Sequence, residues 1–157
     1  MPQLTDVYTL YNGVKIPKIG YGTWQIPDEV AYDSTLAALR SGYRHVDTAK
    51  AYRNENAVGR AVKDSGIPRS EIFVTSKLPA QTKGYQETLD AFESTMKALD
   101  LDVLDLYLIH APWPWDQIGK DCTEGNIQSW KAMEKLDKDG RIRSIGVSNI
   151  SPQDIQA

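Results

Sequence analysis

The chain has 157 residues, of which 41% are hydrophobic and 25% charged, and this is the composition of an ordinary globular domain. The net charge of −3 and the lack of a long basic run argue against a nucleic-acid partner. No apolar stretch approaches the roughly 20 residues of a membrane helix, and the N-terminus lacks the regions of a signal peptide. Cys122, the one cysteine, allows no intrachain disulfide and is interpreted as an incidental thiol. We therefore expect a cytoplasmic protein without a membrane partner.

The N-terminal region is predicted to form a β-hairpin over residues 7–19. Apolar residues alternate on both sides of Asn12-Gly13, and Asn-Gly is the strongest short-range signal for a hairpin. Such a hairpin could cap one end of a larger sheet.

From residue 20 onward, strands and helices are predicted to alternate. Short apolar or β-branched runs indicate the strands, and apolar residues at spacings of three and four indicate the helices. The expected strands are residues 20–24, 45–47, 72–78, 103–109 and 142–147. The expected helices are residues 28–40, 56–65, 85–99 and 127–138, with a polar loop over 111–126 and a further helix beginning at 151–152. The buried face of the first helix is expected to consist of Val30, Leu36, Ala37 and Leu39.

This alternation, with strands that are nearly continuous apolar runs, is typical of a parallel sheet covered by helices. No Gly-x-Gly-x-x-Gly or Walker pattern supports a doubly wound nucleotide fold. The alternative is a (β/α)8 barrel of the TIM type, which needs eight units and typically about 250 residues. We predict an α/β fold in one domain, residues 1–157: an incomplete barrel of about five parallel strands, preceded by the hairpin.

Polar residues at the carboxyl ends of the strands are the candidate functional residues. Adjacent parallel strands end at one face, where α/β proteins place their chemistry. The residues are Thr23-Trp24, Asp47, Lys77, His110 and Ser148-Asn149, with Tyr52 in the loop after the second strand. Each also has a structural explanation. Asp47 could cap the next helix, and Lys77 could be a surface lysine. His110 could be a satisfied strand-end histidine, and Tyr52 could pack the loop.

An acid, a tyrosine, a lysine and a histidine in one place can perform acid–base chemistry on a carbonyl. A phenol has a pKa of about 10, which is too high for an acid at pH 7, and a nearby ammonium lowers that value. A neutral histidine can orient the substrate oxygen. In this arrangement Tyr52 is the general acid, with Asp47 and Lys77 behind it. No side chain supplies hydride, so a nicotinamide cofactor is expected.

Residues 42–59 resemble the signature of the aldo-keto reductases. The stretch Gly-Tyr-Arg-His-Val-Asp-Thr-Ala, followed by Tyr52, Asn54-Glu55 and Val58-Gly59, has the spacing of that family. Residues 72–77, 104–110 and 145–149 are similar to three further family motifs, in family order. The resemblance covers almost the whole chain and looks closest to the bacterial branch similar to 2,5-diketo-gluconate reductases.

The resemblance implies an oxidoreductase that reduces aldehydes or ketones with hydride from C4 of NADPH. The implied catalytic tetrad is Asp47, Tyr52, Lys77 and His110. The implied cofactor contacts are Gly22, Thr23, Asp47, Ser148 and Asn149, and Trp24 is expected to line the substrate pocket. The expected partner is a small carbonyl compound. No metal site is expected, and the full-length form is expected to be a monomer or weak dimer.

The chain departs from the family pattern in two respects. Many relatives carry an aromatic residue directly after the tetrad histidine, where this chain has Ala111-Pro112. Trp113 and Trp115 could refill that wall of the pocket or simply pack the loop, and we expect Trp113 to line the pocket. The family's later strands and its 2′-phosphate site are absent. The residues themselves therefore predict neither a preference for NADPH over NADH nor the identity of the substrate. A catalytically incompetent fragment or a binding module remains an alternative, and open strand edges would favour self-association.

Overall fold

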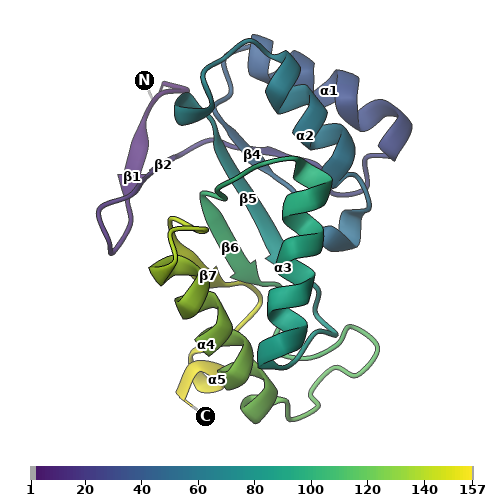
Figure 1. The fold of residues 1–157 in the computed structure, drawn as a ribbon, viewed down its shortest axis with the longest axis vertical. Helices are drawn as coiled ribbons and strands as arrows, with labels where there is room; N and C mark the ends of the chain where they lie inside the picture. The colour runs from purple at the N-terminus through teal and green to yellow at the C-terminus, as the bar shows by residue number, and fades with distance from the viewer. Residues whose placement is uncertain (1–2, 157) are drawn as a thin grey trace.

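The computed structural model describes residues 3–156 and contains a two-stranded hairpin and a larger five-stranded sheet that is packed against helices (Figure 1). The strands are β1 (Val7–Thr9), β2 (Lys15–Pro17), β3 (Tyr21–Gly22), β4 (His45–Asp47), β5 (Phe73–Leu78), β6 (Leu106–Ile109) and β7 (Ile145–Val147). The α-helices are α1 (Asp28–Arg40), α2 (Glu55–Asp64), α3 (Tyr85–Leu99), α4 (Thr123–Lys138) and α5 (Pro152–Gln156). Two 3-10 helices are η1 (Lys50–Tyr52) and η2 (Arg69–Glu71).

The larger sheet has five strands in the order β3-β4-β5-β6-β7, and every neighbouring pair is parallel. The strands follow one another in chain order without a reversal. A doubly wound sheet has such a reversal at its ligand site, whereas a (β/α) barrel adds each new strand beside the last. The predicted barrel-type fold, with about five parallel strands, is therefore confirmed for the described part of the chain.

The helices cover one face of this sheet. The Tyr107 ring of β6 packs edge-to-face on Phe92 of α3, with centroids 5.3 Å apart, and Ser76 of β5 bonds to Glu55 of α2. Ser76 and Tyr107 are register partners, so this face of the sheet is the helix-covered one. Because side chains alternate along a strand, Lys77 lies on the opposite face, which in a closed barrel is the interior.

The hairpin β1–β2 is antiparallel, as predicted, and lies apart from the helices in Figure 1. At its turn the Asn12 side-chain amide donates to the Arg143 carbonyl, at 2.8 Å, just before β7. The hairpin therefore reaches across the amino end of the sheet. The carboxyl end, where the candidate residues lie, is left open.

The predicted buried face of α1 is partly wrong. Leu36 and Leu39 are buried as expected, but Val30 and Ala37 are exposed. Ala31 is buried instead, because the buried stripe of the helix passes through Ala31, Thr35 and Leu39. Apolar residues occur on more than one side of this helix, so their spacing alone did not determine which side faces the core.

Helix α4 begins at Thr123, four residues before the predicted start, so the predicted loop over 111–126 is too long. Its first turn is polar and partly exposed, and therefore carries no apolar periodicity. Asp121 accepts a hydrogen bond from the Thr123 amide at 2.9 Å and starts the helix. None of the helices in residues 3–156 is long and apolar enough to cross a membrane.

Candidate active site

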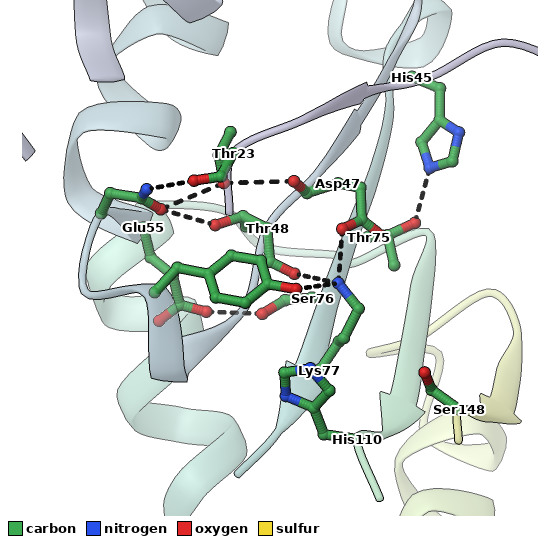
Figure 2. A network of polar contacts seen from close by, with 12 residues as sticks. Thr23, His45, Asp47, Thr48, Glu55, Thr75, Ser76, Lys77, His110 and Ser148 are labelled. Atoms are coloured by element: carbon green, nitrogen blue, oxygen red, sulfur yellow. Dashed lines mark hydrogen bonds and ion pairs between the residues drawn. The ribbon is translucent and has the colours of Figure 1, made fainter. Parts of the chain in front are cut away.

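Lys77, near the end of β5, is the centre of a polar cluster at the carboxyl end of the sheet. Its side chain is only 7% exposed, so the interpretation as a surface lysine is wrong. The ammonium donates to the Asp47 carboxylate at 2.5 Å, to the Thr48 carbonyl at 2.9 Å and to the Tyr52 hydroxyl at 3.3 Å. In Figure 2 these bonds converge on the Lys77 nitrogen. All three acceptors lie between Asp47, the last residue of β4, and Tyr52.

Asp47 is the last residue of β4 and lies in register with Gly22 and Thr75 on the neighbouring strands. The helix that follows begins only at Glu55, so Asp47 does not cap it. Its carboxylate instead neutralises the buried ammonium of Lys77. The alternative of a helix cap is therefore excluded.

Tyr52 ends the short helix η1, and its amide donates to the Ala49 carbonyl at 2.9 Å. The next residue, Arg53, is in the left-handed conformation at φ 61°, which ends the turn and directs the chain into α2. The Tyr52 ring lies edge-to-face with the His110 ring at 5.8 Å. The Lys77 ammonium lies 5.0 Å from the centre of the same ring. The phenol is therefore placed between a cation and an imidazole.

His110 directly follows β6 and is 7% exposed. Burial lowers the pKa of its imidazole to about 4, and the positive charge of Lys77 acts in the same direction. Its Nδ1 atom is buried and has no hydrogen-bond partner among residues 3–156. At neutral pH the ring is therefore uncharged and can donate one N–H or accept one hydrogen bond.

An open cavity of about 690 Å³ lies over these residues. It is lined by Trp24, Gln25, Ala51, Tyr52, His110, Trp115 and Asn149. Trp115 packs edge-to-face on His110 at 5.5 Å, and Trp113 in turn packs on Trp115 at 5.8 Å. The prediction that Trp113 lines the pocket is therefore not met in this cavity. The loop after β6 brings Trp115 to the wall and leaves Trp113 behind it.

The predicted cofactor contacts lie around the opening of this cavity. No atom lies within 4 Å of the position that a Cβ on Gly22 would take, so the space beside Asp47 is open. The Asn149 amide donates to the His110 carbonyl at 2.9 Å and to the Ser148 hydroxyl at 3.1 Å, which ties the two loops together. Thr23 is fully buried, with its hydroxyl directed toward the Asp47 carbonyl at 3.2 Å. Its side chain therefore belongs to the wall of the site rather than to its open surface.

Asn54 and Thr48 were not predicted as site residues. Asn54 is fully buried, and its amide lies within hydrogen-bond distance of Thr23, Ile26 and Thr48. An asparagine directly before a helix is typical of an N-cap, which hides any other role in the sequence. Its partners lie up to 31 residues away, so no local pattern could have identified them.

A second cavity, of about 730 Å³, lies at the opposite, amino end of the sheet. Its lining includes Arg69 and Arg143, and both are paired with the buried carboxylate of Asp105 at 2.6 and 2.8 Å. Both guanidinium groups are thus paired with one carboxylate, and none of the four predicted catalytic residues lines this cavity. The four predicted catalytic residues lie instead at the carboxyl end of the sheet.

The low pKa of His110 predicts a pH-dependent stability. Above about pH 6.5 the His110 ring is neutral in both the folded and the unfolded chain. Between about pH 6.5 and pH 4 only the unfolded chain takes up a proton at this ring. The free energy of unfolding should therefore fall through this range, by up to about 3 kcal/mol from this group. Urea unfolding at pH 7 and pH 4.5 should show a smaller fall for His110→Gln. An NMR titration with a midpoint near 6.5 for His110 would contradict the prediction.

The match to a family model and to solved structures agrees with this geometry. Residues 18–157 match the model of the aldo/keto reductase family. A glyoxal reductase from Bacillus subtilis is 48% identical over 147 residues, which are 93% of this chain and 50% of that protein. A crystal structure of an aldo/keto reductase from Brucella melitensis superposes with a TM-score of 0.89 at 43% identity, covering 96% of this chain and 56% of that one.

A mutant of Gox0644, solved in complex with NADPH, superposes with a TM-score of 0.83 at 38% identity and covers 96% of this chain and 52% of that one. The chain thus spans about half the length of the curated relatives it matches. The family match extends over most of its residues, including every strand of the parallel sheet. The chain belongs to the aldo/keto reductase family.

Proposed function

We propose that the carboxyl end of this sheet serves the NADPH-dependent reduction of aldehydes or ketones to alcohols, with Tyr52 as the proton donor. One observation carries the proposal: a buried ammonium, Lys77, is shared by the Asp47 carboxylate and the Tyr52 hydroxyl at an open cavity. We also propose that residues 1–157 are the N-terminal portion of a reductase barrel, with the hairpin at 7–19 and βα units from residue 20 onward.

The roles of the side chains follow from their contacts. Tyr52 gives its proton to the carbonyl oxygen of the substrate as that oxygen gains negative charge. The ammonium of Lys77 stabilises the phenolate that remains, and Asp47 holds that ammonium in place. His110, neutral beside the phenol, can hydrogen-bond the same carbonyl oxygen and fix its position over the Tyr52 hydroxyl.

The residues at the mouth fit a nicotinamide. The Asn149 amide protons are used within the protein, but no hydrogen bond among residues 3–156 uses its side-chain oxygen or the proton of the Ser148 hydroxyl. This leaves one acceptor and one donor side by side, as a carboxamide requires. Gly22 leaves open space next to Asp47 on the other side of the site. When bound there, the reduced nicotinamide supplies the hydride that no side chain can provide.

The names of the relatives suggest which compounds to test first. One relative is a glyoxal reductase, and one solved relative is a complex with NADPH. A cavity whose walls are Trp24 and Trp115, with the polar Tyr52 and His110 between them, suits a small carbonyl compound. We propose such a compound as the substrate, and NADPH as the cofactor.

The proposal is tested by the absorbance of NADPH at 340 nm. We expect the chain to consume NADPH when glyoxal or another short aldehyde is added, and to produce the alcohol in equal amount. The same assay with NADH in place of NADPH would measure the cofactor preference. With a ketone in place of the aldehyde it would measure the substrate preference. If no aldehyde or ketone causes NADPH consumption above the enzyme-free rate, the proposed reaction is wrong for this chain.

The alternatives predicted from the sequence stay open to the same assay. A binding module or an incompetent fragment would leave NADPH unconsumed, but no contact in the site favours either. A cytoplasmic location, a monomeric or weakly dimeric full-length form and self-association of this chain stay predictions. Size-exclusion chromatography of the purified chain tests the last of these.

A further inference from the structure

We propose that Asn54 is a positioning residue for the proton-donor site, acting through the segment that connects Asp47 to Tyr52. This inference rests on the proposed function, because it assigns a role within that site. Asn54 does not touch the cavity and is fully buried, so it would act only through the residues it holds.

The side chain of Asn54 has a polar neighbour at each of its hydrogen-bonding positions. Its nitrogen donates to the carbonyls of Thr23, at 2.9 Å, and Ile26, at 3.0 Å. Its oxygen accepts from the Thr48 hydroxyl at 3.0 Å and lies 3.2 Å from the Thr23 hydroxyl, whose single proton also faces the Asp47 carbonyl at 3.2 Å. Two donors and two acceptor sites are all that an asparagine side chain has. One amide thus joins the segment after β3, the segment after β4 and the start of α2.

Asn54 also forgoes the local role that its position offers. It is the N-cap residue of α2, where an asparagine side chain normally accepts a bond from the first turn of the helix. Here the side chain makes no such capping bond. It is turned back toward Thr23 and Thr48, which Figure 2 shows beside the Asp47–Lys77 pair. The first turn of α2 therefore lacks a capping hydrogen bond from Asn54, whose side chain contacts Thr23 and Thr48 instead.

Of the residues that Asn54 contacts, Thr48 binds the Lys77 ammonium itself, and Thr23 contacts Asp47, which also binds it. Thr48 supplies the carbonyl that accepts from Lys77 at 2.9 Å. The Thr23 amide donates to the Asp47 carbonyl at 2.9 Å. Tyr52 lies two residues before Asn54, on the turn that leads into α2. The three acceptors of the ammonium therefore lie on one segment, and the Asn54 amide ties that segment to the neighbouring strand end.

Loss of this amide should let segment 47–54 move relative to Lys77. A proton donor that is misplaced by about 1 Å can lose about 100-fold in rate, while ground-state binding changes less. We therefore expect Asn54→Ala to lower kcat for aldehyde reduction by about 10- to 100-fold, with KM for the aldehyde within about threefold. Thr48→Val, which removes the Thr48 hydrogen bond to Asn54, should have a smaller effect, and Thr48→Ser, which keeps the hydroxyl, should keep most of the wild-type rate.

A second measurement does not depend on activity. Hydrogen–deuterium exchange followed by mass spectrometry should show that amides in segment 47–54 exchange about 10-fold faster or more in Asn54→Ala, while those of β5 and α3 stay protected. Asn56→Ala is the matched control, because Asn56 is exposed on the same helix. It should leave exchange and kcat unchanged.

The outcomes separate this inference from the proposed function. If the wild-type chain consumes no NADPH, the proposed function fails, and exchange in segment 47–54 still decides whether Asn54 holds that segment. A uniform rise in exchange over the whole chain, with kcat per folded molecule unchanged, would show a purely structural role and overturn the inference. Unchanged exchange in Asn54→Ala would also overturn it.

Discussion

Tyr52→Phe is expected to lower kcat for aldehyde reduction by at least about 100-fold, because the substituted ring has no proton to give to the carbonyl oxygen. The ring itself, and its edge-to-face contact with His110, can stay in place. Binding of NADPH should therefore remain within about threefold of wild type, since only the transition state uses the hydroxyl proton. Steady-state kinetics at 340 nm and fluorescence titration of NADPH measure the two quantities.

Tyr11→Phe is the matched control for this change. Tyr11 lies on the exposed turn of the hairpin, with 77% of its surface accessible, and is far in the fold from the cavity. This variant should keep the wild-type kcat. Activity in Tyr52→Phe that equals that of Tyr11→Phe would show that another group donates the proton.

Gly59→Ala is expected to destabilise the fold by about 3 kcal/mol. Gly59 lies in α2, where that helix meets the end of α3, and a Cβ on it would stand 2.1 Å from the carbonyl oxygen of Leu99. The clashing atoms are backbone, so no side-chain rotation relieves the contact. Alanine otherwise favours a helix over glycine by about 1 kcal/mol, so any loss of stability must come from this steric conflict.

Urea unfolding followed by circular dichroism measures this loss. Gly22→Ala is the control, since a Cβ there meets no atom within 4 Å and the residue is not at a positive φ. It should change the free energy of unfolding by no more than about 0.5 kcal/mol. Equal stability of the two variants would mean that α2 and α3 are not as close at Gly59 as the structure has them. The same contact explains in physical terms why a glycine stands at this place in the sequence motif.

Much of the fold was predictable because its signals are local. Asn12-Gly13 predicted the hairpin, and the β-branched run that ends at Lys77 predicted the longest strand of the parallel sheet. Order along the chain then placed Asp47, Lys77 and His110 at one end of the sheet, since consecutive parallel strands pair in sequence order. The Asp47–Lys77 pair and the nearby His110 follow from that placement, whereas Tyr52 joins them from the turn after β4.

The remaining features depend on geometry that no local pattern encodes. Trp113 and Trp115 are both tryptophans next to Pro114, so their local sequence does not distinguish them. Only the course of the loop decides which of them lines the cavity. Asn54 has the sequence position of a helix cap, and only the approach of Thr23 and Thr48 gives its amide other partners. In α1 the buried stripe runs through Ala31, Thr35 and Leu39, and the apolar spacing of the helix did not distinguish it from a face with Val30 and Ala37.

Isotope transfer from the cofactor distinguishes the proposed hydride transfer to a carbonyl carbon, with Tyr52 as the proton donor, from any other route to the alcohol. The 157-residue chain is incubated with a short aldehyde and NADPH that carries deuterium at both C4 positions, and the alcohol is analysed by mass spectrometry. We expect an alcohol with one deuterium on the former carbonyl carbon, formed at least about 100-fold more slowly by Tyr52→Phe. An alcohol without deuterium, or one formed equally fast by the variant, would contradict it.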